Sequence, residues 1–97
     1  MVAIQTPLQT TIQPDAIAFS HADADQVSWM ATRGSTAKRI VIDMARAHEA
    51  STSAFARLVL LRRSLLKVGR DLRLTNLHDQ AAGLYEVIRL REVLPTI

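Results

Sequence analysis

The feature that most constrains the fold is an alternation of strand and helix patterns in the second half of the chain. The β-branched run at 40–42 (IVI), set between charged residues, is typical of a buried central strand. Apolar residues from Ala54 to Val68 then recur in steps of four and three, which is the spacing of one helix face. The segment 71–75 (DLRLT) alternates as a half-buried strand does. A strand, a helix and a strand in this order predict a parallel pair joined by a helical crossover.

The remaining segments extend this unit at both ends. Residues 8–12 and 15–20, separated by the turn signal Gln13-Pro14-Asp15, predict a β-hairpin. Possible N-caps at 21–25 precede a short helix that ends at Gly34. A long helix follows the N-cap candidates at 51–53 and ends at Gly69, and a last helix follows cap candidates at 76–79. Its buried side carries Ala81, Ala82, Tyr85, Ile88 and Val93. The sequence therefore predicts one α/β domain over 1–97, in the order β-β-α-β-α-β-α, with helices packed on a mixed sheet of about four strands.

Composition narrows the classes of chemistry. The 97 residues are 48% apolar and 22% charged, which predicts a small folded core with little room for a deep active site. The absence of cysteine excludes disulfides and thiolate chemistry. His21, His48 and His78 lie far apart and form no HxH or HxxxH pair, so the spacing predicts no metal site and no cofactor.

The formal charge of +3 raises the question of a nucleic-acid surface. Seven of the twelve basic residues lie between positions 46 and 73: Arg46, Arg57, Arg62, Arg63, Lys67, Arg70 and Arg73. The aromatic residues are scattered and do not interleave with these arginines, as a stacking surface would require. We interpret the cluster as a solvated face and expect no nucleic-acid partner.

The sequence also shows no pattern typical of a secretory signal or a membrane-spanning segment. The first residues have no early Lys or Arg and no continuous apolar stretch, so they do not predict a secretory signal. Apolar runs such as 58–61 are far shorter than the roughly 20 residues that cross a bilayer. We expect a cytoplasmic protein without membrane insertion.

Residues 37–95 carry a family resemblance. A hydrophobic strand ends in Asp within IVIDM (40–44), a loop leads to the tetrad Ser51-Thr52-Ser53-Ala54, and an apolar helix then runs to Gly69. This order and spacing resemble the STAS family, the sulfate transporter and anti-sigma factor antagonist domain, in which the tetrad reads DSSG. Here Ser51 replaces the Asp and Ala54 replaces the Gly, while Arg89-Leu90 stands where the family usually has GL. The resemblance implies a STAS-like sandwich.

The resemblance also implies a function, that of a bacterial regulatory protein-binding module rather than an enzyme. In phosphoregulated relatives the residue after the tetrad's Asp is phosphorylated by a partner serine kinase. That position is Thr52 here, with Ser53 as the alternative acceptor. The implied partner is a serine kinase or anti-sigma factor in a signalling pathway that regulates transcription. The alternative is an unphosphorylated STAS subunit that binds the ATPase of a lipid-transport ABC transporter.

The residues themselves allow two interpretations of this segment. A phosphate at Thr52 would be tolerated at a helix N-terminus, where free amide groups and the helix dipole favour negative charge. Ser51, Thr52 and Ser53 are equally typical of plain N-caps. Four positions after Ser53, Arg57 lies on the same helix face, where it can pair with a phosphate or an acidic partner residue.

The implied partner-binding surface consists of His48, Glu49, Ser51, Thr52, Ser53 and Arg57. Adjacent loop residues such as His48 and Glu49 rarely converge on one proton, and no oxyanion feature accompanies them. We therefore predict no catalytic residue.

Overall fold

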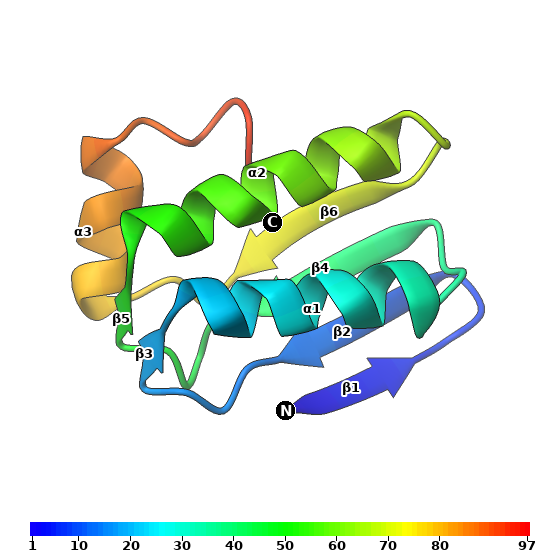
Figure 1. The fold of residues 1–97 in the computed structure, drawn as a ribbon, viewed down its shortest axis with the longest axis horizontal. Coiled ribbons are helices and arrows are strands. Elements are labelled where there is room, and N and C mark those ends of the chain that lie inside the picture. Colours follow the sequence, from blue (N-terminus) through cyan, green and yellow to red (C-terminus); the bar gives the residue numbers. More distant parts are fainter.

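Four strands form a mixed sheet in the computed structural model, which describes residues 1–97 (Figure 1). The strand order across the sheet is β1-β2-β4-β6, and only the β1–β2 pair is antiparallel. Their bounds are β1 Val2–Gln5, β2 Gln9–Gln13, β4 Arg39–Asp43 and β6 Asp71–Thr75. The predicted α/β class, with a mixed four-stranded sheet and three helices, is confirmed.

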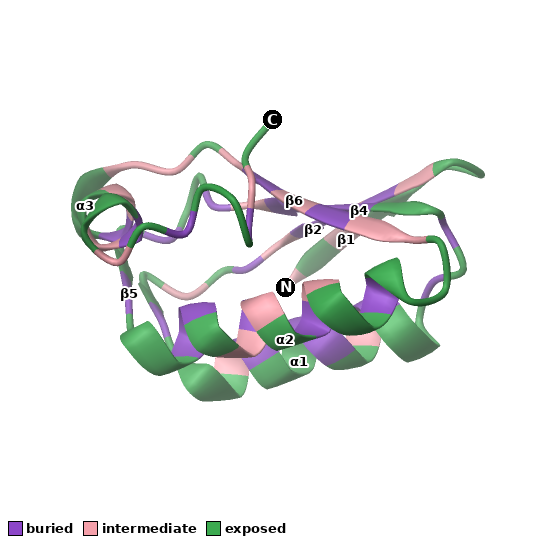
Figure 2. Ribbon diagram, turned by 90° about the horizontal axis from the view of Figure 1, so that it is seen from above, coloured by how far each residue is buried: buried purple, intermediate pink, exposed green.

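Two helices cover one face of the sheet. Figure 2 shows α1 (His21–Arg33) and α2 (Thr52–Leu66) side by side on that face, while the opposite face carries no helix. The third helix, α3 (Asp79–Val87), lies beside one end of the sheet, next to the short strand β5 (Glu49–Ala50). No helix has both the length and the apolar composition that a membrane crossing requires.

The predicted hairpin paired the wrong two strands. Strand β2 pairs with β1, whereas residues 15–20 contain only the two-residue strand β3 (Ala18–Phe19), which runs parallel to β5. The hairpin turn lies at Thr6-Pro7, where the Thr6 amide and the Gln9 carbonyl close it at 2.8 Å. Pro14 has no amide hydrogen to donate to a ladder, so it favours the end of β2 that is seen at Gln13.

Helix ends differ from the sequence expectation by a few residues. The N-cap of α1 is Ser20, which forms a capping box with Asp23, rather than a residue of 21–25. Helix α2 ends at Leu66, and Gly69 takes a left-handed φ of 75° in the turn beyond it. Helix α3 ends at Val87, so Val93 lies outside it and is exposed rather than buried.

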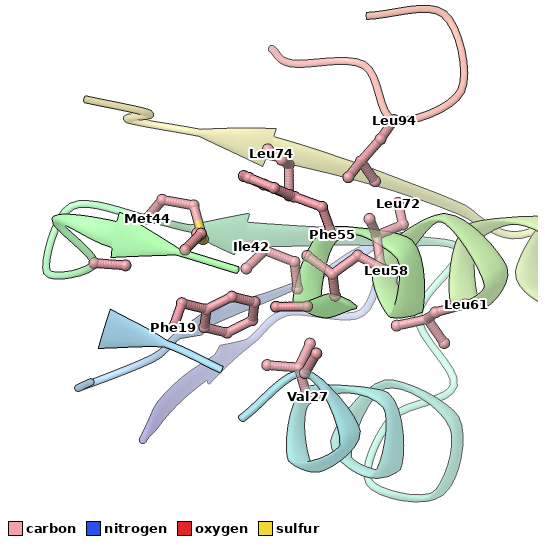
Figure 3. Close-up of a cluster of buried hydrophobic side chains, with 14 of the residues drawn as sticks. Phe19, Val27, Ile42, Met44, Phe55, Leu58, Leu61, Leu72, Leu74 and Leu94 are labelled. Atoms are coloured by element: carbon pink, nitrogen blue, oxygen red, sulfur yellow. The ribbon is translucent and has the colours of Figure 1, made fainter. Parts of the chain in front are cut away.

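One core of 21 buried residues draws on every helix and strand except β1, whose Ala3 packs against it while only partly buried. The predicted helical stripe is largely correct, since Ala54, Leu58, Leu61 and Leu65 are all buried on α2, together with Phe55. Figure 3 shows the α2 side chains meeting Ile42 and Leu72 of the sheet and Val27 of α1. The core thus fixes α2 on the sheet and against α1.

Candidate functional site

The carboxyl ends of the parallel strands gather the loops that carry the predicted site. Asp43, at the end of β4, accepts hydrogen bonds from Gln13 Nε2, the Ala45 amide and Asn76 Nδ2, each at 3.0 Å. Burial raises the pKa of the Asp43 carboxyl, but these hydrogen bonds together bring it below its usual range. Asp43 therefore ties β2, the 44–51 loop and the 76–78 loop to one another.

The three hydroxyl side chains at the start of α2 have different environments. Ser51 is the N-cap, and its Oγ accepts from the Ala54 amide at 3.1 Å. The Ser53 hydroxyl lies 3.1 Å from Ser51 Oγ. Thr52 is exposed, and its hydroxyl makes no hydrogen bond in the structure. Because Ser51 performs the capping, Thr52 is free for another role.

An apolar groove begins at Thr52. It lies between the side of α2 next to the core stripe and the segment after α3. Its lining consists of Thr52, Ala56, Val59, Leu60, Ile88, Leu90 and Val93, of which only Thr52 is polar. Leu60 is 54% exposed and Val93 is 46% exposed, so large apolar side chains meet solvent here. The groove is therefore a candidate surface for binding another molecule.

Arg57 is not directed at the helix start. Its Nε donates to Asp25 Oδ1 at 2.8 Å, and its second guanidinium nitrogen donates to Ser28 Oγ at the same distance. These bonds join α2 to α1. A phosphate at Thr52 would therefore have to compete with Asp25 for this guanidinium.

His48 directly precedes β5 and Glu49 is its first residue, and α3 docks against this segment. The Ala81 amide donates to the His48 carbonyl at 3.2 Å, and the Ala50 amide donates to Gln80 Oε1 at 2.8 Å. Glu49 is exposed and makes no ion pair. The predicted residues 48–53 thus form one continuous edge, while Arg57 belongs to the α1–α2 contact.

Two histidines that are distant in sequence meet at this edge. His48 Nδ1 lies 2.6 Å from Asp79 Oδ2, and His78 Nδ1 lies 3.1 Å from the same oxygen. The two imidazole rings meet edge to face, with centroids 4.8 Å apart. The hydrogen bond from His48 and the charge of His78 hold the pKa of the Asp79 carboxyl below its usual range.

Most of the basic residues between positions 46 and 73 form ion pairs or hydrogen bonds within the chain. Besides Arg57, Arg46 pairs with Asp15, while Arg62 and Arg73 both pair with Asp71. Arg70 donates to the backbone carbonyls of Ala31, Ser35 and Ala37. Five of the seven residues therefore hold the fold together, which leaves Arg63 and Lys67 without such contacts.

Sequence reasoning missed the groove and the His78-Asp79 pair. Val59 lies next to the core stripe of α2, but it is only partly buried and lines the groove with Leu60. A second apolar row at 52, 56, 59 and 60, spaced as a helix face beside the core stripe, was the available signal. For His78-Asp79 the signal was its place after a strand parallel to β4, since such loops meet at one edge.

Comparison with known proteins adds no family assignment. No protein-family model matches the sequence, and no curated protein matches it at a significant level. The fold and the site geometry therefore carry the functional argument.

Proposed function

We propose that this chain is a STAS-like, anti-sigma factor antagonist-like module that binds a serine kinase or anti-sigma partner in the cytoplasm and is switched by phosphorylation of Thr52. The observation that carries the proposal is the position of Thr52. Its hydroxyl is exposed and makes no hydrogen bond, and it stands at the rim of an apolar groove. A modification there changes the surface without removing the cap of α2.

The physical basis of the switch is charge next to an apolar interface. With Thr52 unmodified, apolar side chains of the partner fill the groove and remove Leu60 and Val93 from water. A phosphate adds roughly −1.5 to −2 charges at the rim. The N-terminal amides of α2 tolerate this charge within the free protein. In the complex, the same phosphate loses water and meets apolar atoms, so the partner is released.

The second candidate function is a constitutive subunit that binds the ATPase of a lipid-transport ABC transporter. It is favoured by the composition of the groove, since every lining residue except Thr52 is apolar. Obligate interfaces are more apolar than transient ones. In this alternative the same groove holds the ATPase and Thr52 is never modified.

The switch is tested by phosphorylation. Incubation with any serine kinase encoded near the gene and with ATP should add the mass of one phosphate, measured by intact-protein mass spectrometry. Thr52→Ala should abolish the addition, whereas Ser53→Ala should retain it. Transfer that persists in Thr52→Ala and disappears in Ser53→Ala would move the acceptor to Ser53. A lack of transfer, together with recovery of a transporter ATPase in a pull-down, would favour the second function.

The binding surface is tested separately with a matched pair of leucines on α2. Leu60 lines the groove and is 54% exposed, while Leu66 is 47% exposed and lies outside the groove. Leu60→Glu should weaken binding of the partner by tenfold or more, about the 1.4 kcal/mol of a modest interface contact. Leu66→Glu should leave the affinity unchanged. Equal effects of the two variants would contradict the role of the groove.

A further inference from the structure

We infer that His48, His78 and Asp79 form a binding site for a divalent transition-metal ion of the zinc class. One potential ligand atom from each residue lies within 4.8 Å of the others. His48 comes from the loop before α2, and the other two residues come from the turn that begins α3. The site shares no residue with the groove, although His48 also belongs to the predicted partner-binding surface.

The hydrogen bonds of His78 determine which of its nitrogens faces the carboxylate as an acceptor. His78 Nε2 lies 2.9 Å from the Ala45 carbonyl oxygen, which can only accept, so Nε2 carries a hydrogen and donates it. In a neutral imidazole, Nδ1 is then a bare lone pair. This lone pair lies 3.1 Å from Asp79 Oδ2, a second acceptor. The contact is favourable only when a proton or a cation stands between them.

His48 directs a second imidazole at the same oxygen. Its Nδ1 lies 2.6 Å from Asp79 Oδ2. In the metal-free protein, a hydrogen on His48 Nδ1 satisfies this contact, whereas a neutral His78 leaves its own contact unmatched and only the doubly protonated ring satisfies it. A divalent cation bound by both Nδ1 atoms and by the Asp79 carboxylate would satisfy all three groups at once. The cluster therefore has the arrangement of a cation site.

The donor set and its spacing suit zinc. Imidazole nitrogen and carboxylate oxygen bind Zn²⁺ at about 2.0 to 2.2 Å, which places neighbouring ligands of a tetrahedron about 3.3 Å apart. The separations of 2.6 and 3.1 Å between the His Nδ1 atoms and Asp79 Oδ2 need only a small widening to reach that value. Three protein ligands leave a position for water. The His78 Nε2 donation to a backbone carbonyl is the outer contact that orients metal-bound histidines.

The backbone holds the ligands in place while leaving the site accessible. Asp79 adopts a φ of 53°, which turns its side chain back toward the loop, and the Ala81 amide bonds to the His48 carbonyl. The side chains of His48 and Asp79 are 53% and 57% exposed, so an ion can reach them from solvent. With two of the three ligands this exposed, we expect modest affinity and easy exchange.

The experiment is a calorimetric titration of ZnCl₂ into untagged protein that has been treated with chelator and desalted. We expect one ion per chain, and no comparable heat from MgCl₂, because Mg²⁺ prefers oxygen ligands. His48→Ala, His78→Ala and Asp79→Asn should each weaken zinc binding by at least about tenfold, the lower end of what a lost supporting contact costs. The Asp79→Asn variant suits the site because Asn accepts positive φ well.

The matched control is His21→Ala. His21 lies on α1, 3.4 Å from Asp25 and away from the cluster, so its removal should leave zinc affinity unchanged. Far-UV circular dichroism checks that each variant folds, and zinc-dependent shifts of the wild-type imidazole ¹⁵N resonances identify the ligands without mutation. Absence of zinc binding at millimolar concentration, imidazole shifts confined to His21, or undiminished affinity in Asp79→Asn and His48→Ala would overturn the proposal.

Discussion

At the scale of single residues, the α2 start shows how adjacent hydroxyl side chains acquire different roles. The backbone geometry of an N-cap allows one side chain to reach the free amides of the first turn, and Ser51 occupies that position. Thr52 is the first residue of the helix, where its hydroxyl projects outward. Ser51 can therefore cap the helix while its neighbour Thr52 is open to modification, and measurements of stability can distinguish these two roles.

The first prediction concerns that separation. Ser51→Ala should lower the free energy of unfolding by about 1 kcal/mol, because the Ala54 amide loses its acceptor. Thr52→Ala should change it by no more than about 0.5 kcal/mol, as is usual for an exposed side chain without partners. Urea unfolding followed by circular dichroism measures both. A Thr52→Ala cost equal to that of Ser51→Ala would show that Thr52 shares the cap.

At the scale of elements, a helix or strand could be predicted from the sequence where its pattern of apolar residues lies within one segment. The β-branched run of β4, the leucine spacing of α2 and the alternation of β6 each fall within one segment, and each was predicted within a few residues. The choice of which strands pair with each other is not determined by local sequence. Nothing within residues 9–13 indicates whether β2 pairs with the chain before it or after it, and the Thr6-Pro7 turn decided for β1.

The same distinction applies to the candidate site. His48, Glu49 and Ser51 to Ser53 were predicted because they lie close together in the sequence and include a tetrad that resembles a known one. His78 and Asp79 approach His48 only because β4 and β6 are parallel neighbours, which brings the loops after them together. Arg57 was assigned to the helix start, but its contact with Asp25 depends on how α1 lies against α2. Tertiary pairing decided both outcomes.

The second prediction compares two glycines at helices. Gly69 has a φ of 75°, which costs an L-residue about 1 to 2 kcal/mol, so Gly69→Ala should destabilise the protein by about that amount. Gly83 lies within α3, and a Cβ there would meet no atom within 4 Å. Gly83→Ala should therefore stabilise by roughly 0.5 to 1 kcal/mol. Thermal unfolding of the two variants should shift in opposite directions, and shifts in the same direction would contradict this account.

At the scale of the whole molecule, both the covering helices and the ion pairs stabilise the sheet. One face of the sheet is covered by α1 and α2 (Figure 2), and the free edge of β6 is met by the C-terminal segment, where the Leu74 amide donates to the Pro95 carbonyl. Asp71 stands at this junction. It joins Arg62 of α2 and Arg73 of its own strand, at 2.9 and 3.0 Å. The global stability should therefore respond to the charge of this carboxylate.

The third prediction is the pH dependence that follows. Burial raises the pKa of Asp71, but hydrogen bonds from Arg73, the Leu72 amide and Arg62 outweigh it and leave the pKa below its usual value. The unfolded chain then binds a proton before the folded protein does, so this contribution is complete above the unfolded pKa of about 3.9 and is lost as the pH falls through the lower folded value. Asp71→Asn should reduce stability at pH 6 by about 1 kcal/mol or less and flatten its decline between pH 5 and 2.5.

Urea midpoints of wild type and Asp71→Asn, measured across that range, test the sign as well as the size. The two curves should converge toward low pH, because protonation of Asp71 removes in the wild type the charge that the substitution has already removed. Glu92→Gln changes an exposed carboxylate that forms no ion pair, and it should run parallel to the wild type. Curves of Asp71→Asn and wild type that stay parallel down to pH 2.5 would mean that the Arg62 and Arg73 contacts do not stabilise the charged carboxylate. The junction of α2, β6 and the C-terminal segment would then be held by packing of Leu72 and Leu94 and by the backbone hydrogen bonds of Leu74.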